Sequence, residues 1–573
     1  MSVARPVIGN VWGLVRPYWS GDDRRRAWGL LLTVMVLNLA LIAIEVGFNN
    51  WNNSFYNALQ NLDGGAFRRA LLEFCALAAA FILVAVYAQY LQQMLQIRWR
   101  QWLTRFVLDQ WLGNQAYYRI AQLDPPVDNP DQRIAEDINQ FTANTLDLSL
   151  GLMRAVVTLL SFLTILWTLS GTLSFAMAGR IVSIPGYMVW VAVLYSIAGS
   201  WLALKIGYPL IRLNFQQQRY EADFRFGLIR VRENAEAVAL YRGEQAEHGE
   251  LGRRFGLLFD NFYQLMRRQK RLTWFTSAYG QIAIIFPILV AAPRYFAKEI
   301  HLGGLMQTVS AFGQVQGAMS WLVSAYPAVA DWKATVDRLM TFERGIRRAD
   351  ALEPVEPQCC GNRLAVHGLT LFTPDRRILL EQVQFSLAAG DSLWMRGPSG
   401  CGKSTLLKAL AGIWPYASGQ ICLPVAQRVR FLSQRPYLPL GSLRAALCYP
   451  AKAGAIDDRQ LVAILHEVGL VHFSDRLDSC ESWAHVMSLG EQQRIALARV
   501  LLDPPDVLCL DEASSALDEG MELLLYARIA VVMRDGILLS VGHRAGLGQH
   551  HRATLDVSRF MPAEPASTIR AMA

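Results

Sequence analysis

The sequence contains few charged residues for its length. Charged side chains make up 18% of the 573 residues and hydrophobic side chains 53%, whereas soluble domains usually carry about a quarter charged residues. The shortage lies mainly in the first 330 residues. A chain of this length also exceeds what one hydrophobic core serves. The composition therefore excludes a single soluble domain and indicates that part of the chain lies in lipid.

The cysteines lack the spacing of a metal site or a disulfide framework. Eight are present, seven of them beyond residue 358, and no Cys-x-x-Cys pair occurs. These spacings argue against zinc. The formal net charge of +8 does not require nucleic acid, because arginines that border apolar segments satisfy the positive-inside rule. We therefore expect a lipid bilayer and no nucleic acid among the partners.

Six stretches contain no charged residue and are long enough, or nearly so, to cross about 30 Å of hydrocarbon. They are residues 27–44, 74–97, 155–179, 181–204, 272–293 and 302–330. Two long, arginine-rich connections, 98–154 and 205–271, are expected in the cytosol. We predict an all-α membrane domain over residues 1–343, with six helices at about 27–48, 70–97, 149–179, 181–208, 272–293 and 302–330.

The pattern changes after the membrane domain. Residues 344–362 contain prolines and lose the apolar periodicity, which predicts a linker. From 363 to 560, short β-rich runs alternate with helical segments, which is typical of an α/β domain. The tail, 561–573, is expected to be disordered.

A phosphate-binding loop follows the first apolar runs of the α/β domain. GPSGCGKST matches GxxxxGK[ST], and its glycines let backbone N–H groups close around phosphate oxygens. The next helix points its positive end at the same anion. Lys403 is expected to reach the β- and γ-phosphates and Ser404 to ligate Mg²⁺. The predicted ATP-binding residues here are Gly397, Pro398, Ser399, Gly400, Cys401, Gly402, Lys403, Ser404 and Thr405.

Two adjacent acids end a later apolar run. VLCL, residues 507–510, reads as a buried strand followed directly by Asp511 and Glu512. Asp511 is placed to hold Mg²⁺ and Glu512 to polarise an attacking water. Two solvated acids after a strand are the simpler alternative, which the phosphate loop disfavours.

Further motifs resemble those of ATP-binding-cassette proteins. MSLGEQQR (487–494) resembles the signature motif, FLSQRPYLP (431–439) the Q-loop, SALD (515–518) the D-loop and SVGHR (540–544) the switch-histidine segment. The resemblance implies that Ser488, Gly490 and Glu491 contact ATP. It also implies catalytic roles for Gln434, which would contact Mg²⁺, and for His543.

The resemblance also implies an aromatic residue near Thr373 that stacks on adenine. The adjacent Phe372 is the candidate for that position.

The front half is similar to one branch of these transporters. GFNNWNNSFYNALQNLD (47–63) and DNPDQRIAEDI (128–138) look like bacterial YddA-like and BacA-related transporters and peroxisomal fatty-acyl half-transporters of the adrenoleukodystrophy type. The resemblance implies a half-transporter that pairs with a second copy, uses ATP and Mg²⁺, and lies in the bacterial inner membrane with its ATP-binding domain in the cytosol.

The expected function is ATP-driven, alternating-access transport of an amphipathic or hydrophilic solute, peptide-like or vitamin-like. Alternatives are a fatty-acyl or lipid-like cargo, and a membrane ATPase that gates a channel or partner instead of transporting. A nucleic-acid-associated ATPase is disfavoured by the six apolar stretches.

Glu45 follows the first stretch. A carboxylate at membrane depth predicts a cargo cavity, and an interfacial residue in water is the alternative.

Overall fold

The computed structural model describes residues 11–21, 23–123, 129–177, 180–359, 361, 363–424, 428–454 and 456–562. The chain divides into two compact units. The helical unit comprises Met1–Val107 and Asn129–Thr341, and the α/β unit comprises Leu108–Asp128 and Phe342–Ala573.

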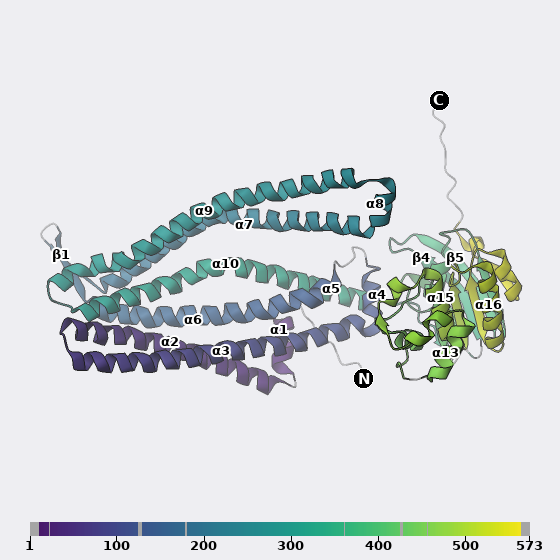
Figure 1. Ribbon diagram of the computed structural model, residues 1–573, viewed down its shortest axis with the longest axis horizontal. Coiled ribbons are helices and arrows are strands. Elements are labelled where there is room, and N and C mark those ends of the chain that lie inside the picture. The colour runs from purple at the N-terminus through teal and green to yellow at the C-terminus, as the bar shows by residue number, and fades with distance from the viewer. Residues whose placement is uncertain are drawn as a thin grey trace, which may run out of the picture. The chain divides into compact units, whose positions relative to one another are not determined.

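The helical unit consists of long helices that run back and forth (Figure 1). α7 and α9 form a long antiparallel pair that α8 closes at one end (Figure 1), and α2 and α7 both contact α6. The elements are α1 (Val11–Ser20), α2 (Arg24–Gln60), α3 (Gly64–Leu112), α5 (Pro130–Gln132), a π-helical turn (Arg133–Asp137), α6 (Ile138–Ser170), α7 (Tyr187–Glu233), α8 (Ala235–Tyr241), α9 (Glu244–Phe296) and α10 (Leu302–Asp350).

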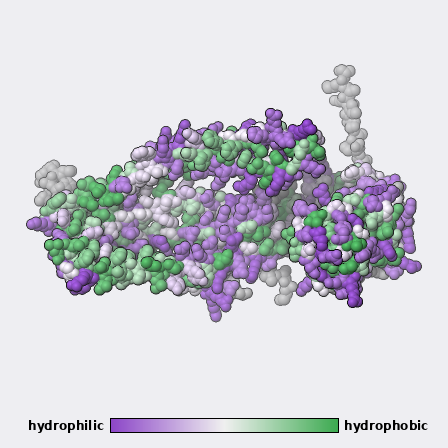
Figure 2. Space-filling model, viewed as in Figure 1, coloured by the Kyte–Doolittle hydropathy of each residue, from purple (hydrophilic) through white to green (hydrophobic). Residues whose placement is uncertain are grey.

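The outer face of these helices is apolar. On α3, Leu72, Ile82 and Leu83 are all more than half exposed. In Figure 2, hydrophobic side chains gather over the α2–α3 end of the helical unit. A soluble helix buries such residues, so this face is one that lipid or another protein covers.

The region between α6 and α7 differs from the prediction. Helix bounds of 179 and 181 were expected, but α6 ends at Ser170 and α7 begins at Tyr187. Between them β1 (Thr172–Met177) and β2 (Arg180–Pro185) form an antiparallel hairpin. The Arg294 guanidinium donates to the carbonyls of Leu169 and Ser170 and so caps α6. Gly171 then leaves the helix at a φ of +60°.

Five of the described helices, α2, α3, α6, α7 and α9, are long and apolar enough to cross a membrane. The predicted sixth span, 302–330, lies within α10, which is not among them. A helical membrane domain is therefore confirmed, and the count of six spans stays a prediction.

The asparagine-rich end of α2 binds the start of α10. Asn49 Nδ2 donates to the Gln307 carbonyl (3.0 Å), and Asn53 Nδ2 donates to Gln307 Oε1 (2.8 Å). A Cβ on Gly303 would lie 2.1 Å from the Asn53 carbonyl oxygen, so the two backbones approach as closely as glycine allows. These polar side chains join α2 to α10.

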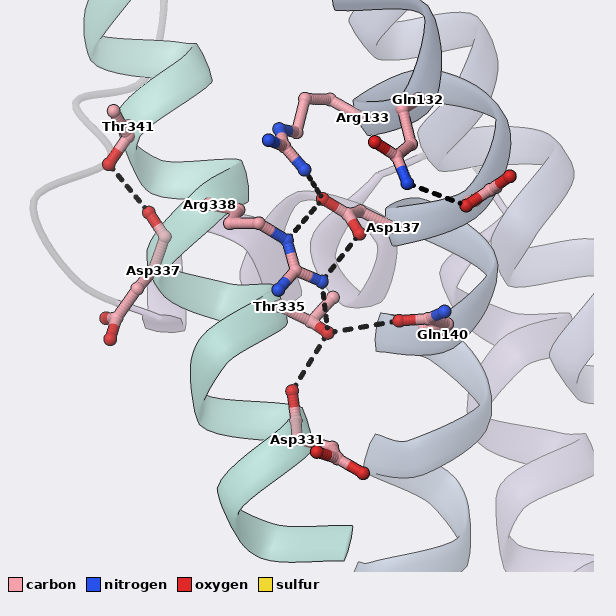
Figure 3. A network of polar contacts seen from close by, with 10 residues as sticks. Gln132, Arg133, Asp137, Gln140, Asp331, Thr335, Asp337, Arg338 and Thr341 are labelled. Atoms are coloured by element: carbon pink, nitrogen blue, oxygen red, sulfur yellow. Dashed lines mark hydrogen bonds and ion pairs between the residues drawn. The ribbon is translucent and has the colours of Figure 1, made fainter. Parts of the chain in front are cut away.

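A buried carboxylate joins the start of α6 to α10 (Figure 3). Asp137, only 2% exposed, accepts from Arg338 Nε (2.9 Å), Arg338 Nη2 (2.7 Å) and Arg133 Nη1 (2.8 Å). Arg338 also donates to Thr335 Oγ1, which donates to Gln140 Oε1. A bidentate arginine–carboxylate pair fixes orientation as well as distance, so the network sets how α10 lies against α6.

The α/β unit contains two larger sheets. A parallel sheet has the order β13-β6-β12-β11-β8, and a second sheet has the order β3-β7-β4-β5. The strands are β3 (Gln358–Cys359), β4 (Arg363–Phe372), β5 (Ile378–Ala388), β6 (Ser392–Arg396), β7 (Ala417–Leu423), β8 (Val429–Leu432), β11 (Val507–Asp511), β12 (Ile537–Val541) and β13 (Ala553–Asp556), with a small pair of β9 (Gly441–Ser442) and β10 (Cys480–Glu481).

Helices and short helical turns surround these sheets. They are α4 (Ala116–Ile120), α11 (Lys403–Leu410), α12 (Leu443–Cys448), α13 (Asp458–Glu467), α14 (Trp483–Val486), α15 (Leu489–Leu502), α16 (Glu519–Val532) and 3₁₀ turns at Gly113–Gln115, Val471–Arg476, Ala545–His550 and Val557–Phe560. The first four residues of β11 and all of β12 are buried, as expected of central strands covered on both faces.

The predicted linker is partly helical. α10 continues to Asp350, into the predicted linker of 344–362, and residues 352–357 lack regular structure. Of the predicted tail, residues 563–573 lie outside the described part of the chain.

Candidate functional site

The parallel sheet brings the predicted catalytic segments to one edge. β6, β12, β11 and β8 are neighbours in that order. The phosphate loop follows β6, His543 follows β12, Glu512 follows β11 and Gln434 follows β8. Because all four strands are parallel, their carboxyl ends lie at the same edge, where ligands bind in open α/β sheets.

The phosphate loop depends on its glycines. Gly397, Gly400 and Gly402 have φ values of +153°, +81° and +98°, where other residues are strained. A Cβ on Gly402 would also lie 3.0 Å from the Leu379 side chain. Gly402 is the N-cap of α11 and makes no side-chain capping bond. The first N–H groups of α11 can therefore serve an anion.

Lys403 lies inside this loop and is only 6% exposed. Its Nζ donates to the carbonyls of Gly397 (2.9 Å) and Pro398 (2.8 Å). Cys401 is also buried, whereas Ser399 and Ser404 are exposed. A buried ammonium group that is held by loop carbonyls places positive charge at the centre of the loop, where phosphate oxygens would meet it.

Ser404 and Asp511 fit a Mg²⁺ site. Ser404 Oγ donates to Asp511 Oδ1 at 2.9 Å. Burial raises the pKa of Asp511, the hydrogen bond from Ser404 lowers it, and the negative charge of Glu512 raises it again, with a net upward shift. Hydroxyl and carboxylate oxygens are the donors that Mg²⁺ prefers, and a cation would relieve the unfavourable charge on Asp511.

Glu512 is held at both carboxylate oxygens. His543 Nε2 lies 3.0 Å from Oε1, and Gln434 Nε2 donates to Oε2 at 3.1 Å. The backbone of Glu512 has a φ of +50°, and its N–H donates to the Val541 carbonyl at 3.1 Å. A non-glycine residue in this conformation is uncommon and often lies at a functional site. The structure thus brings together the three residues that were predicted to be catalytic.

The predicted signature residues form the start of α15. Ser488 is the N-cap, and the Glu491 carboxylate accepts from Ser488 N and Ser488 Oγ, both at 2.9 Å. His472 Nε2 lies 3.1 Å from the other Glu491 oxygen. A Cβ on Gly490 would be 2.8 Å from the Ala516 carbonyl oxygen. In this chain the Glu491 carboxylate therefore closes a capping box.

Gln493 was missed by the sequence reasoning. It is fully buried on α15, and its Nε2 donates to the Gln434 carbonyl (2.9 Å) and to Ser515 Oγ (3.2 Å). Its Oε1 accepts from Ala516 N at 2.9 Å. Gln493 thus joins α15, the segment of Gln434 and the segment that follows Glu512. Its place in MSLGEQQR was the available signal, but only the fold shows which glutamine points inward.

Phe372 ends β4 and is half-buried against the core of the α/β unit. Its N–H donates to the Tyr416 carbonyl (2.8 Å), and its carbonyl accepts from Trp414 Nε1 (3.0 Å). The stacking role on adenine stays a prediction.

Glu45 lines a cavity in the helical unit. The cavity has a volume of about 360 Å³ and lies among α2, α3, α6 and α10. Asp147 and Arg154 of α6 also line it. The carboxylate of Glu45 is half-buried, and it is the only predicted site residue outside the α/β unit.

The two units together define a membrane-bound nucleoside triphosphatase. One unit carries apolar helices of membrane length. The other carries a glycine-rich loop, a buried lysine and an oriented carboxylate at one edge of a parallel sheet.

Comparison with known families gives a more specific assignment. The family described as ABC transporter transmembrane region 2 matches residues 14–296, and the family described as ABC transporter matches residues 380–515. The inner membrane ABC transporter ATP-binding protein YddA of Escherichia coli K12 is 34% identical over 559 residues, which cover 97% of this chain and 99% of that protein. The chain belongs to the ABC transporter family, as a half-transporter that couples ATP hydrolysis to transport.

Other similar proteins agree with this assignment. ABC transporter D family member 2, chloroplastic, of Arabidopsis thaliana is 35% identical over an alignment of 629 positions. This alignment covers 97% of this chain and 86% of that protein. A bacterial Atm1-family ABC exporter with ATP bound has a similar fold, with a TM-score of 0.69 at 17% identity over 94% of each chain. The predicted family is confirmed, and so is the fold class of a helical membrane domain followed by an α/β ATP-binding-cassette domain, without the count of six helices.

Proposed function

We propose that the chain works as a homodimer in the bacterial inner membrane and moves an amphipathic or hydrophilic solute by alternating access. The observation that carries this proposal is the Gln434–Glu512–His543 cluster beside the phosphate loop. It gives a chain with membrane helices the means to hydrolyse the nucleotide that it binds. Similarity to an inner membrane protein over almost the whole chain supports the location.

The loop residues bind the phosphates of ATP in this proposal. Backbone N–H groups of 397–405 surround the phosphate oxygens, and Lys403 pairs with the β- and γ-phosphates. Ser404, Asp511 and Gln434 would hold Mg²⁺, which when bound neutralises charge on the phosphates.

Glu512 acts on the attacking water. A general base must lie within hydrogen-bond reach of the proton that it accepts, in a fixed orientation. Gln434 and His543 supply that orientation because they contact different oxygens of the same carboxylate. In this proposal, His543 would also contact the γ-phosphate.

A second copy completes each ATP site. The chain has one phosphate loop and one signature segment, and in ATP-binding-cassette proteins ATP lies between the loop of one domain and the signature of the other. Ser488 and Gly490 would face the partner's γ-phosphate. Leu240 and Tyr241, at the end of α8, are 77% and 87% exposed in one chain, and an apolar tip of this kind fits contact with a partner.

Closure of the α/β units would pull on the helices through residues 113–123. Tyr416 Oη donates to the Gln122 carbonyl (2.8 Å), and Arg119 Nη1 donates to the Leu352 carbonyl (3.3 Å). This segment directly continues α3. A movement of the sheet therefore has a hydrogen-bonded route to a predicted membrane helix.

The direct test is Glu512→Gln in the full-length protein. ATP binding should persist, because the loop is unchanged, while turnover should fall at least about a hundredfold, as expected when a positioned base is lost. Glu381→Gln, on the exposed side of β5, is the matched control and should hydrolyse ATP at the wild-type rate. Unchanged hydrolysis in Glu512→Gln would refute the assignment.

A further inference from the structure

The cavity that contains Glu45 is lined by single faces of its helices. Asn38 and Glu45 are seven residues apart on α2, and Asp147, Gly151 and Arg154 follow the same spacing on α6. Residues three, four and seven apart share one helix face. The volume of about 360 Å³ is at the lower end of the roughly 300–1,000 Å³ typical of small-molecule sites. The cavity therefore suits one small molecule.

Two charged groups of the cavity, Arg154 and Asp147, are hydrogen-bonded to neutral side chains. Arg154 Nη2 donates to Asn38 Oδ1 at 2.7 Å, and Gln92 Nε2 donates to Asp147 Oδ1 at 2.6 Å. These bonds orient Arg154 and Asp147, and the Glu45 carboxylate lies close enough to Arg154 to interact with its charge. Glu45 is predicted at membrane depth, where an ionisable residue is costly and is a candidate for ligand binding. Two carboxylates and one guanidinium thus face the same small space.

Part of the cavity lining is apolar. Leu150, Ala318 and Trp321 contribute to it. A Cβ on Gly151 would be 2.7 Å from Trp321 Cζ2, so the indole lies against the backbone of α6. The cavity therefore offers charge of both signs beside an aromatic surface.

We propose that this cavity binds a small zwitterion with an apolar body, such as an amino-acid-like solute. Its carboxylate pairs with Arg154, its ammonium with Glu45 and Asp147, and its apolar part lies on Trp321. A simple anion would meet two carboxylates, and a simple cation would meet the guanidinium, whereas a zwitterion satisfies both. The proposal rests on the proposed transport function and specifies the class of its cargo.

The test measures binding to the full-length protein in lipid nanodiscs without ATP. Radiolabelled leucine is the probe, and leucinamide, N-acetylleucine and N-acetylleucinamide are the competitors, which lack one or both charges. Leucine should bind at least about tenfold more tightly than each capped form, because each cap removes a charge-assisted contact.

Substitutions assign each charge to its partner. Arg154→Gln should abolish the preference for leucine over leucinamide, and Glu45→Gln should reduce the preference over N-acetylleucine. Arg154→Lys keeps the positive charge and should keep the selectivity, so it also controls for misfolding. Arg69→Gln and Glu73→Gln, both exposed on α3, are matched controls that should bind as the wild type does.

The outcomes separate this proposal from the proposed function. If a preparation that hydrolyses ATP binds all four compounds equally, binds none of them, or prefers leucinamide, the zwitterion site is refuted and the ATP-driven cycle stands. If the wild-type preparation does not hydrolyse ATP although leucine binds selectively, the proposed function fails and the site stands.

Discussion

Replacement of Gln493 with alanine should destabilise the α/β unit. The substitution leaves the Gln434 carbonyl and the Ala516 N–H without their partner. Both residues are exposed, so each loss should cost about 1 kcal/mol, the lower end for an unpaired polar group, and the two together roughly 2 kcal/mol. In a unit of about 150–250 residues, each kcal/mol lowers the melting temperature by about 2–4 °C. The apparent melting temperature should therefore fall by roughly 4–8 °C.

The same substitution should slow turnover more than it weakens ATP binding. Gln493 holds the backbone of Gln434, whose side chain holds Glu512, while Lys403 has no bond to Gln493 among the described residues. We expect kcat to fall at least about tenfold, equivalent to about 1.4 kcal/mol of barrier, with little change in the KM for ATP.

Gln492→Ala is the matched control for the turnover measurement. Within the residues that the structure describes, Gln492 donates to the carbonyls of Ala484 and Met487, just before α15. It should therefore keep the wild-type kcat. If Gln493→Ala melts within about 2 °C of the wild type and keeps its kcat, the idea that this side chain organises the site is refuted.

Two further variants test other contacts. Asp137→Ala removes the carboxylate that Arg338 and Arg133 share. Arg338 is 37% exposed, so the loss of these charge-assisted hydrogen bonds should cost about 1.5–3 kcal/mol. Thermal unfolding should therefore occur at a lower temperature than in the exposed control Asp131→Ala, and equal melting would contradict this reading. For Glu491, burial raises the pKa, while hydrogen bonds from Ser488 and His472 lower it below the ordinary value of 4.5, with a net downward shift. Its ionised form therefore stabilises the fold fully above pH 4.5 and loses this effect as the pH falls through the lowered folded pKa. The stability gap between wild type and Glu491→Gln should close as the pH falls below about 4.5; a gap that does not change over that range would show that the charge is immaterial.

The phosphate loop and the two acids were predictable because their chemistry is local. An apolar strand, a glycine-rich turn and a helix start specify the loop within a few residues, and VLCL specifies the strand that presents Asp511 and Glu512. The pairing of Glu512 with Gln434 and His543 was not readable in the same way, because it depends on the order of β8, β11 and β12 in the sheet. The resemblance to a family supplied that information.

The errors arose where hydropathy does not distinguish between structures. Residues 172–185 are largely apolar, and an apolar hairpin has the same composition as the end of a membrane helix. The contact that ends α6 comes from Arg294, more than a hundred residues later, and no local pattern predicts it. Gln493 was missed for the same reason, since its partners lie on other elements.

The central claim is that two copies share each ATP site, and complementation tests it most directly. Lys403→Ala disables the phosphate loop, and Ser488→Glu places a negative charge where the partner's γ-phosphate would lie. Each variant alone should be inactive. Co-expressed with different tags and isolated as the mixed dimer, the two should form one intact site per dimer and regain roughly half of the wild-type ATPase rate, if the two sites of the symmetric dimer act independently. A mixed dimer as inactive as its parents, or a stable monomer that hydrolyses ATP at the full rate, would contradict the account.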